Sequence, residues 1–152
     1  ESPTNIDYFS INYNNDNTNY YKSNDSTEKI SVPYISDFML FKNERKRFNL
    51  DEYSLALEYS TGILNNDYYN EAYISGFVNN PLFISGEMTI KVHFYDNEYN
   101  ELLAHQEKIE LLGPGYTNIS LYCGASIEEL PVNKTADDIY YYKIEILQLS
   151  KD

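Results

Sequence analysis

The stretch from position 73 to position 115 decides the fold that this sequence predicts. It reads YISGFVNN from position 73, MTIKVHFYD from position 88, ELLAHQEKIELL from position 101 and GPG from position 113. Apolar residues fall on alternate positions in the three longer runs, and Asn, Asp, Pro or Gly residues stand between them. A period of two predicts strands that bury one face, and the intervening residues predict turns. We therefore expect three consecutive strands here.

Each run carries a more specific expectation. Gly76 lies inside the first run, which predicts a bulge or a close approach of two backbones. After the second run, Asp96 is expected to bond backbone amides two residues on in a hairpin turn, where Asn100 tolerates left-handed geometry. Residues 101–112 have helical propensity, but the flanking turns favour a strand. The second run is expected to point four side chains into the core: Met88, Ile90, Val92 and Phe94.

Further strands are expected on both sides of this stretch. Residues 54–60 alternate cleanly, residues 116–122 are β-prone, and a single helical turn is expected over 126–130. About seven short strands, separated by turn residues and without any βαβ rhythm, are typical of an antiparallel β-sandwich. The last strand, over 139–149, is expected to place these side chains on one face: Tyr140, Tyr142, Ile144 and Ile146.

The chain divides into two parts by composition. Residues 1–29 are rich in Asn and Ser and predict a linker or tether, with one short strand over 6–13. Residues 30–152 form the predicted sandwich domain, and Pro33 assigns its first segment to an edge or an irregular strand. A basic cluster follows, which we interpret as a solvated turn and, alternatively, as an anion-binding patch. It comprises Lys42, Arg45, Lys46 and Arg47.

Charge and cysteine content exclude several classes of protein. The 152 residues carry a formal net charge of −13, which repels nucleic acids and anionic membrane surfaces. A single cysteine, Cys123, excludes an internal disulfide and is expected to be a small buried core residue. No apolar run approaches the roughly 18 residues of a transmembrane segment. The start at Glu1 fits a removed signal peptide or a lipid anchor upstream, and equally a shortened chain.

Several motifs together resemble the FxLYD-type domains of bacterial secreted proteins and lipoproteins. Residues 73–80 are similar to the family pattern I-x-G-x-V-x-N, residues 90–96 to V-x-V-x-F-Y-D, and residues 109–115 to I-x-x-L-x-P-G. The resemblance covers roughly residues 53–149, and the glycine usual after the Tyr-Asp step is replaced by Tyr99-Asn100. It implies an Ig-like sandwich in an extracellular setting, and it brings no catalytic residues.

Candidate site residues are few. His93 and His105 lack the spacing of a metal motif and have no recognisable Ser or Cys partner, so we expect neither a catalytic nor a metal role. Calcium binding by the acidic turn from Asp96 to Glu101 is a hypothesis, because loops of a sandwich can supply oxygen ligands. Exposed tyrosines form a candidate protein- or glycan-binding surface: Tyr20, Tyr21, Tyr68, Tyr69 and Tyr141.

These observations favour a non-enzymatic, extracellular binding or spacer domain of a bacterial surface lipoprotein, without a cofactor and with an unknown protein or glycan ligand at the cell surface. Two alternatives stay open. One is a glycan-active enzyme that uses paired carboxylates. The other is a protein-interaction domain that adds a partner's strand to an exposed edge, such as the edge near Pro33.

Overall fold

The structure is a computed structural model that describes residues 28–29, 32–42, 44–50, 53–81, 85–111 and 118–151. The expected strand over 6–13, most of the expected linker, and the turn at Gly113 to Gly115 lie outside these residues. Within the described ranges the chain forms these strands: β1 (Glu28–Lys29), β2 (Tyr34–Ile35), β3 (Met39–Leu40), β4 (Arg45–Leu50), β5 (Leu55–Asn65), β6 (Asn70–Asn79), β7 (Gly86–Tyr95), β8 (Glu101–Leu111), β9 (Asn118–Ser126) and β10 (Tyr141–Lys151).

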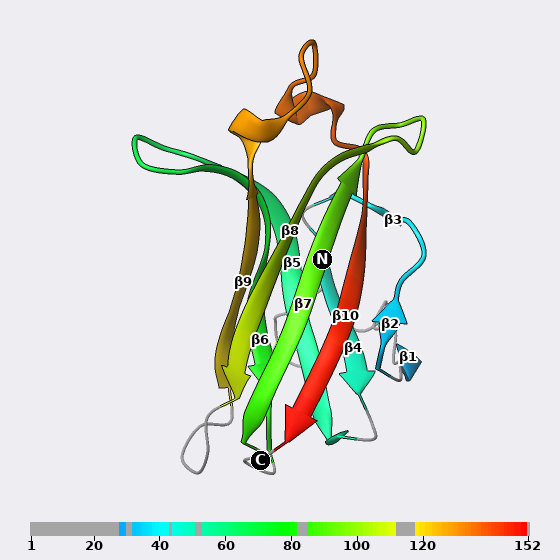
Figure 1. Ribbon diagram of the computed structural model, residues 1–152, viewed down its shortest axis with the longest axis vertical. Coiled ribbons are helices and arrows are strands. Elements are labelled where there is room, and N and C mark those ends of the chain that lie inside the picture. The colour runs from blue at the N-terminus through cyan, green and yellow to red at the C-terminus, as the bar shows by residue number, and fades with distance from the viewer. Residues whose placement is uncertain are drawn as a thin grey trace, which may run out of the picture.

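The strands form two sheets that pack face to face (Figure 1). The first has the order β1-β4-β5-β6-β9, and the second has the order β2-β10-β7-β8, with β3 also pairing with β10. Every pairing is antiparallel except that of β1 with β4. The predicted all-β sandwich is therefore confirmed. Its long strands are the seven from β4 to β10, and the other three have two residues each.

The inner faces of the two sheets form one hydrophobic core. The alternation that predicted β7 is confirmed, because Met88, Ile90, Val92 and Phe94 are completely buried. The last strand follows its expected pattern at Tyr142, Ile144 and Ile146. Tyr140 was expected on the same face, and this was wrong: it precedes β10 and is exposed. The two sheets also meet through a buried pair, in which the hydroxyls of Tyr59 and Tyr142 lie 3.2 Å apart.

Gly76 is the point where β6 lies closest to its neighbour. The register of β6 with β5 and β9 continues through Gly76 without a shift, so there is no bulge at this position. The alternative, a close approach of backbones, is confirmed. A Cβ atom on Gly76 would lie 1.9 Å from the carbonyl oxygen of Glu58 and 2.7 Å from the Cα of Tyr59.

The basic cluster was expected to form a turn, and this was wrong for three of its four residues, since only Lys42 lies in the bend between β3 and β4. Arg45, Lys46 and Arg47 begin strand β4, which pairs with β5. Both arginines bind the carboxylate of Glu58 on that strand, Arg45 at 3.6 Å and Arg47 more closely. A strand was not expected because three adjacent charges mask the alternation, which becomes visible only at Phe48 and Leu50.

Candidate functional site

Five aromatic rings gather on the outer face of the second sheet, near the end where β7 turns into β8. We call them the aromatic patch: Phe38, Tyr95, Tyr99, Tyr140 and Tyr141. Tyr99 is 53% exposed, Tyr140 49% and Phe38 39%. Large aromatic side chains that stay exposed together, next to polar groups, are typical of surfaces that contact other molecules.

The rings support one another in a fixed geometry. Tyr99 and Tyr141 stack with their centroids 4.7 Å apart and their planes inclined by 10°. Phe38 packs edge-on against Tyr99 at 4.7 Å and against Tyr95 at 4.8 Å. Tyr140 adds a tilted contact with Tyr141 at 4.8 Å. Because each ring has an aromatic neighbour at a favourable separation, the patch is ordered before any ligand binds.

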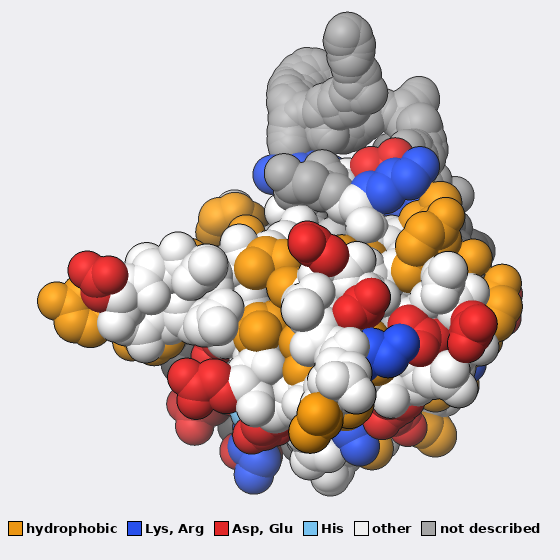
Figure 2. All heavy atoms as spheres, turned by 90° about the horizontal axis from the view of Figure 1, so that it is seen from above, with side chains coloured by type: hydrophobic (Ala, Val, Ile, Leu, Met, Phe, Trp, Pro, Cys, Tyr) orange, Lys and Arg blue, Asp and Glu red, His pale blue; other side chains and the backbone are white. Residues whose placement is uncertain are grey.

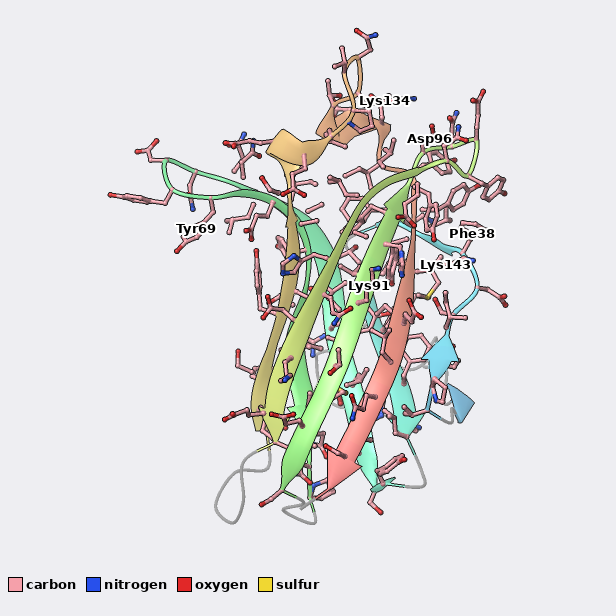
Figure 3. The ribbon with its side chains drawn as sticks, in the orientation of Figure 1. Phe38, Tyr69, Lys91, Asp96, Lys134 and Lys143 are labelled. Carbon is pink, nitrogen blue, oxygen red and sulfur yellow. The ribbon has the colours of Figure 1, made fainter. Side chains whose placement is uncertain are left out.

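The connection between β2 and β3 places Phe38 on this face. Ser36 extends the pairing with β10, since its N–H donates to the carbonyl of Ile144 at 2.9 Å. The N–H of Ile144 donates in turn to Oγ of Ser36 at 3.0 Å. With the backbone held there, Phe38 lies over β10, and the ammonium group of Lys143 sits 4.1 Å from its ring centroid (Figure 3). A cation over a ring face is an attractive contact.

Polar groups border the patch on β7, β8 and β10. His93 lies between two carboxylates, with Nδ1 3.0 Å from Glu101 and Nε2 3.0 Å from Glu145. At least one of the two ring nitrogens donates a hydrogen bond to its carboxylate, because imidazole carries a hydrogen on one nitrogen in either tautomer. Burial, together with the charge and hydrogen bond of Glu101, raises the pKa of Tyr95 to about 12, so its hydroxyl stays a donor. The border thus combines carboxylate acceptors with an imidazole and a phenol hydroxyl.

The β7–β8 turn presents Tyr99 to solvent through a network around Asp96. The carboxylate of Asp96 accepts from the N–H group of Glu98 at 2.9 Å, as predicted, and also from the N–H group of Asn100 at 2.9 Å. It also accepts from the side chain of Asn100 and from Lys134, each at 3.2 Å. The left-handed residue of the turn is Tyr99, with a φ of 66°, and not Asn100 as expected. Asn100 instead uses its side chain to hold Asp96.

The hydrogen bonds around Asp96 predict how the stability of the protein changes at acidic pH. Hydrogen bonds from Asn100, Glu98 and Lys134 lower the pKa of Asp96 from 3.8 to about 2. The ionised carboxylate therefore contributes stability that is complete above pH 3.8 and is lost as the pH falls through about 2. Asp96→Asn should unfold at a lower temperature than the wild type at neutral pH, and this difference should shrink steadily as the pH falls from 4 towards 2.

Thermal unfolding followed by circular dichroism from pH 2 to pH 7 checks this prediction. Glu98→Gln removes a charge from the same turn without touching the network's acceptor, and should leave the pH profile unchanged. A difference between Asp96→Asn and wild type that stays constant over this pH range would contradict the account.

The other residues considered as site candidates are Cys123, His105 and the acidic turn at Asp96. Cys123 is completely buried, as expected, and burial raises its pKa to about 12. His105 contacts Glu107 at 2.7 Å on β8. The structure does not favour the calcium hypothesis at Asp96, because its carboxylate oxygens already accept hydrogen bonds from the groups described above, including the ammonium group of Lys134. Among the described residues, no group of three or more His, Cys, Asp or Glu side chains is arranged to hold a metal ion.

Of the five candidate tyrosines, only Tyr141 belongs to the aromatic patch. Tyr68 and Tyr69 lie at the tip of the β5–β6 hairpin, and Figure 3 shows Tyr69 on the lateral side of the molecule opposite Phe38. Tyr20 and Tyr21 lie outside the described residues. Sequence reasoning missed Phe38, because it stands in an irregular segment, and Glu145, because its role depends on pairing with β7. The sequence signal that could have located the patch is the pair Tyr99 and Tyr140, because each is an aromatic residue beside a turn or connection.

Comparisons with known proteins provide no relative for this chain. No family model, no curated protein and no solved structure matches it. In the part of the chain that the structure describes, no helix has the length and apolar character needed to cross a membrane. Functional inference therefore rests on the sequence and on the geometry of the sandwich.

Proposed function

We propose that this chain is a non-enzymatic, extracellular binding module of a bacterial surface lipoprotein, and that the aromatic patch is its contact surface for a protein partner. The single observation that carries the proposal is the gathering of five mutually packed rings, three of them substantially exposed, on one sheet face. The setting at the cell surface, and the assignment to the FxLYD-type Ig-like modules, rest on the sequence motifs described above.

The composition of the patch favours a protein partner. Tyrosine rings offer a large, rigid contact area at a small entropic cost, which is why they dominate binding surfaces on other sandwich domains. Here Tyr99 projects from a turn, which is where sandwich modules carry their recognition residues. Around it, Lys143, Glu101 and Glu145 supply charged groups that can set orientation and specificity. A glycan ligand is the second outcome that the experiment below distinguishes.

The test removes the most exposed rings. Tyr99→Ser combined with Tyr140→Ser should weaken partner binding by a factor of at least about ten, because an interface ring that acts as a hot spot contributes about 2 kcal/mol or more. Binding is measured with the immobilised full chain, against surface proteins of the source cells and, separately, against their purified surface glycans. We expect the immobilised wild-type chain to retain a surface protein that the double variant does not retain.

A matched double variant controls for the loss of exposed apolar area. Phe77→Ser combined with Leu147→Ser removes two exposed side chains outside the patch, and should leave binding unchanged. If the two rings are needed only for binding to the purified glycans, the ligand of the patch is a glycan and not a protein. If both double variants retain the partner as well as the wild type does, the aromatic patch is not the contact surface.

A further inference from the structure

Strand β9 is an edge strand of unusual composition. Among the described strands it forms a hydrogen-bonded ladder only with β6, so the other side of its backbone has no paired strand. Strand β8 of the second sheet lies near β9, with Sγ of Cys123 3.3 Å from the carbonyl oxygen of His105, but does not pair with it. Its nine residues, NISLYCGAS, contain neither a charged residue nor a proline. Natural sheets protect exposed edges with charges, prolines or bulges. The other long edge strand on this side, β8, follows that rule with Glu101, Glu107, Lys108 and Glu110.

The sequence of β9 is suited to pairing with a copy of itself. In an antiparallel pair centred on Tyr122, this residue faces Tyr122 of the second copy, Ser120 faces Gly124, and Asn118 faces Ser126. No like charges oppose each other, and an aromatic cross-strand pair lies at the centre, which stabilises a sheet. Two identical antiparallel strands are related by a twofold axis, so the interface closes with two copies.

The β5–β6 hairpin provides a second contact on the same side. We call residues 63–71 the arm. Figures 1 and 2 show it projecting from the body beyond β9, with hydrophobic and acidic side chains at its tip. Tyr68 is 88% exposed and Tyr69 58%. The turn is nevertheless ordered, because Oδ1 of Asn66 accepts from the N–H groups of Tyr68 and Tyr69 at 2.8 and 2.7 Å.

We propose that two copies of the chain associate through antiparallel pairing of β9 with β9, and that the arm of each copy, which begins beside Ser126, packs near the Asn118 end of β9 in the other copy. Strand pairing alone buries little of the roughly 1,200–2,000 Å² typical of a specific interface, and the arm with its tyrosines adds the missing apolar area. Phe38 of the aromatic patch lies on the opposite lateral side, over β10 (Figure 3), and the patch stays free in both copies. The dimer would present two patches, and bind a multivalent surface more tightly than one copy does.

Sedimentation equilibrium of the full chain tests the proposal, with the expected mass twice the 17.8 kDa of one copy. Tyr122→Lys removes the aromatic cross-strand pair at the twofold axis and should weaken the dimer at least about tenfold. The single copy should stay folded, because Glu71, now bonded by the Tyr122 hydroxyl, can accept the lysine. The matched control is Phe77→Lys, the same charge change on β6, one strand away from the edge, with no loss of dimer expected.

Salt gives an independent readout. Each copy carries a net charge of −13, so adding sodium chloride should strengthen the dimer by screening the repulsion between copies. A single-copy mass at all concentrations and salt levels overturns the proposal. If removal of residues 1–27 then produces a dimer, the chain's own N-terminal segment is the occupant of the edge, which also overturns it.

Cysteine cross-linking tests the register. Tyr122→Cys should form a disulfide-linked dimer on mild oxidation, because only residue 122 faces itself and opposed residues of paired strands lie within disulfide range. Ser120→Cys faces Gly124 of the second copy and should not cross-link. The buried thiol of Cys123 adds little background. Equal cross-linking at positions 120 and 122 contradicts the proposed pairing.

Discussion

Gly76→Ala is expected to prevent the chain from forming its native sandwich. The added Cβ would lie 1.9 Å from the carbonyl oxygen of Glu58 and 2.7 Å from the Cα of Tyr59. Both atoms belong to the backbone of β5, which is held on its other side by β4, so they cannot move aside as a side chain can. The clash must therefore separate β5 from β6, and a cost above about 4 kcal/mol approaches the whole stability of many domains.

Gly62→Ala is the matched control for this prediction. Its Cβ would meet the hydroxyl end of the Tyr73 side chain at 2.6 Å, and this ring can rotate away. We expect Gly62→Ala to unfold cooperatively with a loss of at most about 2 kcal/mol, within the usual range for single substitutions. Urea unfolding followed by circular dichroism compares the two variants. Native-like stability of Gly76→Ala would show that β5 and β6 do not approach as described.

Tyr142→Ala is expected to destabilise the protein by about 3–5 kcal/mol, as for other large buried aromatic side chains. Tyr142 is 1% exposed and lies on β10, and its ring packs edge-on against Tyr59 of β5 with centroids 6.3 Å apart. The side chain thus fills the space between the two sheets. Tyr142→Phe keeps the ring and loses only a hydroxyl–hydroxyl contact, so it should cost about 0.5–1.5 kcal/mol.

Unfolding at alkaline pH separates the contribution of the Tyr142 hydroxyl from that of its ring. Burial raises the pKa of its hydroxyl above the ordinary value of 10.0. The neutral phenol therefore contributes stability that is complete below pH 10 and falls as the pH rises above 10, where the unfolded chain ionises and the folded chain does not. Tyr142→Phe should lose less stability than wild type between pH 9 and pH 11 in urea unfolding. Parallel curves for the two proteins would contradict the buried phenol.

The fold was accessible from sequence where one face of a strand is buried and the other is not. In β7 the alternation of Met88, Ile90 and Val92 with polar residues reports this directly, and the prediction was right. The alternation failed at β4, whose adjacent charges are matched by Glu58 across the sheet. It also failed at Tyr140, since apolar character alone does not show where a strand begins.

The candidate site was less accessible, because it depends on contacts between distant segments. The hydrogen bond between Asp96 and the N–H of Glu98 was predicted correctly, since the two residues are only two positions apart, whereas the bond from Asn100 was not predicted. Phe38 reaches Tyr99 and Tyr141 only after the segment between β2 and β3 has docked on β10. His93 likewise meets Glu145 through a register that no local pattern specifies. Such pairings over more than fifty positions follow from topology and not from spacing.

The central claim, that the aromatic patch is the contact surface of this module, is tested most directly by site-specific photo-crosslinking on intact source cells. A photoreactive phenylalanine analogue replaces Tyr99 in the patch or, as a control, Leu147 farther along the same sheet. We predict a discrete cross-linked protein product from position 99 and none from position 147. Absence of a product at position 99, or equal products at both positions, would contradict the claim.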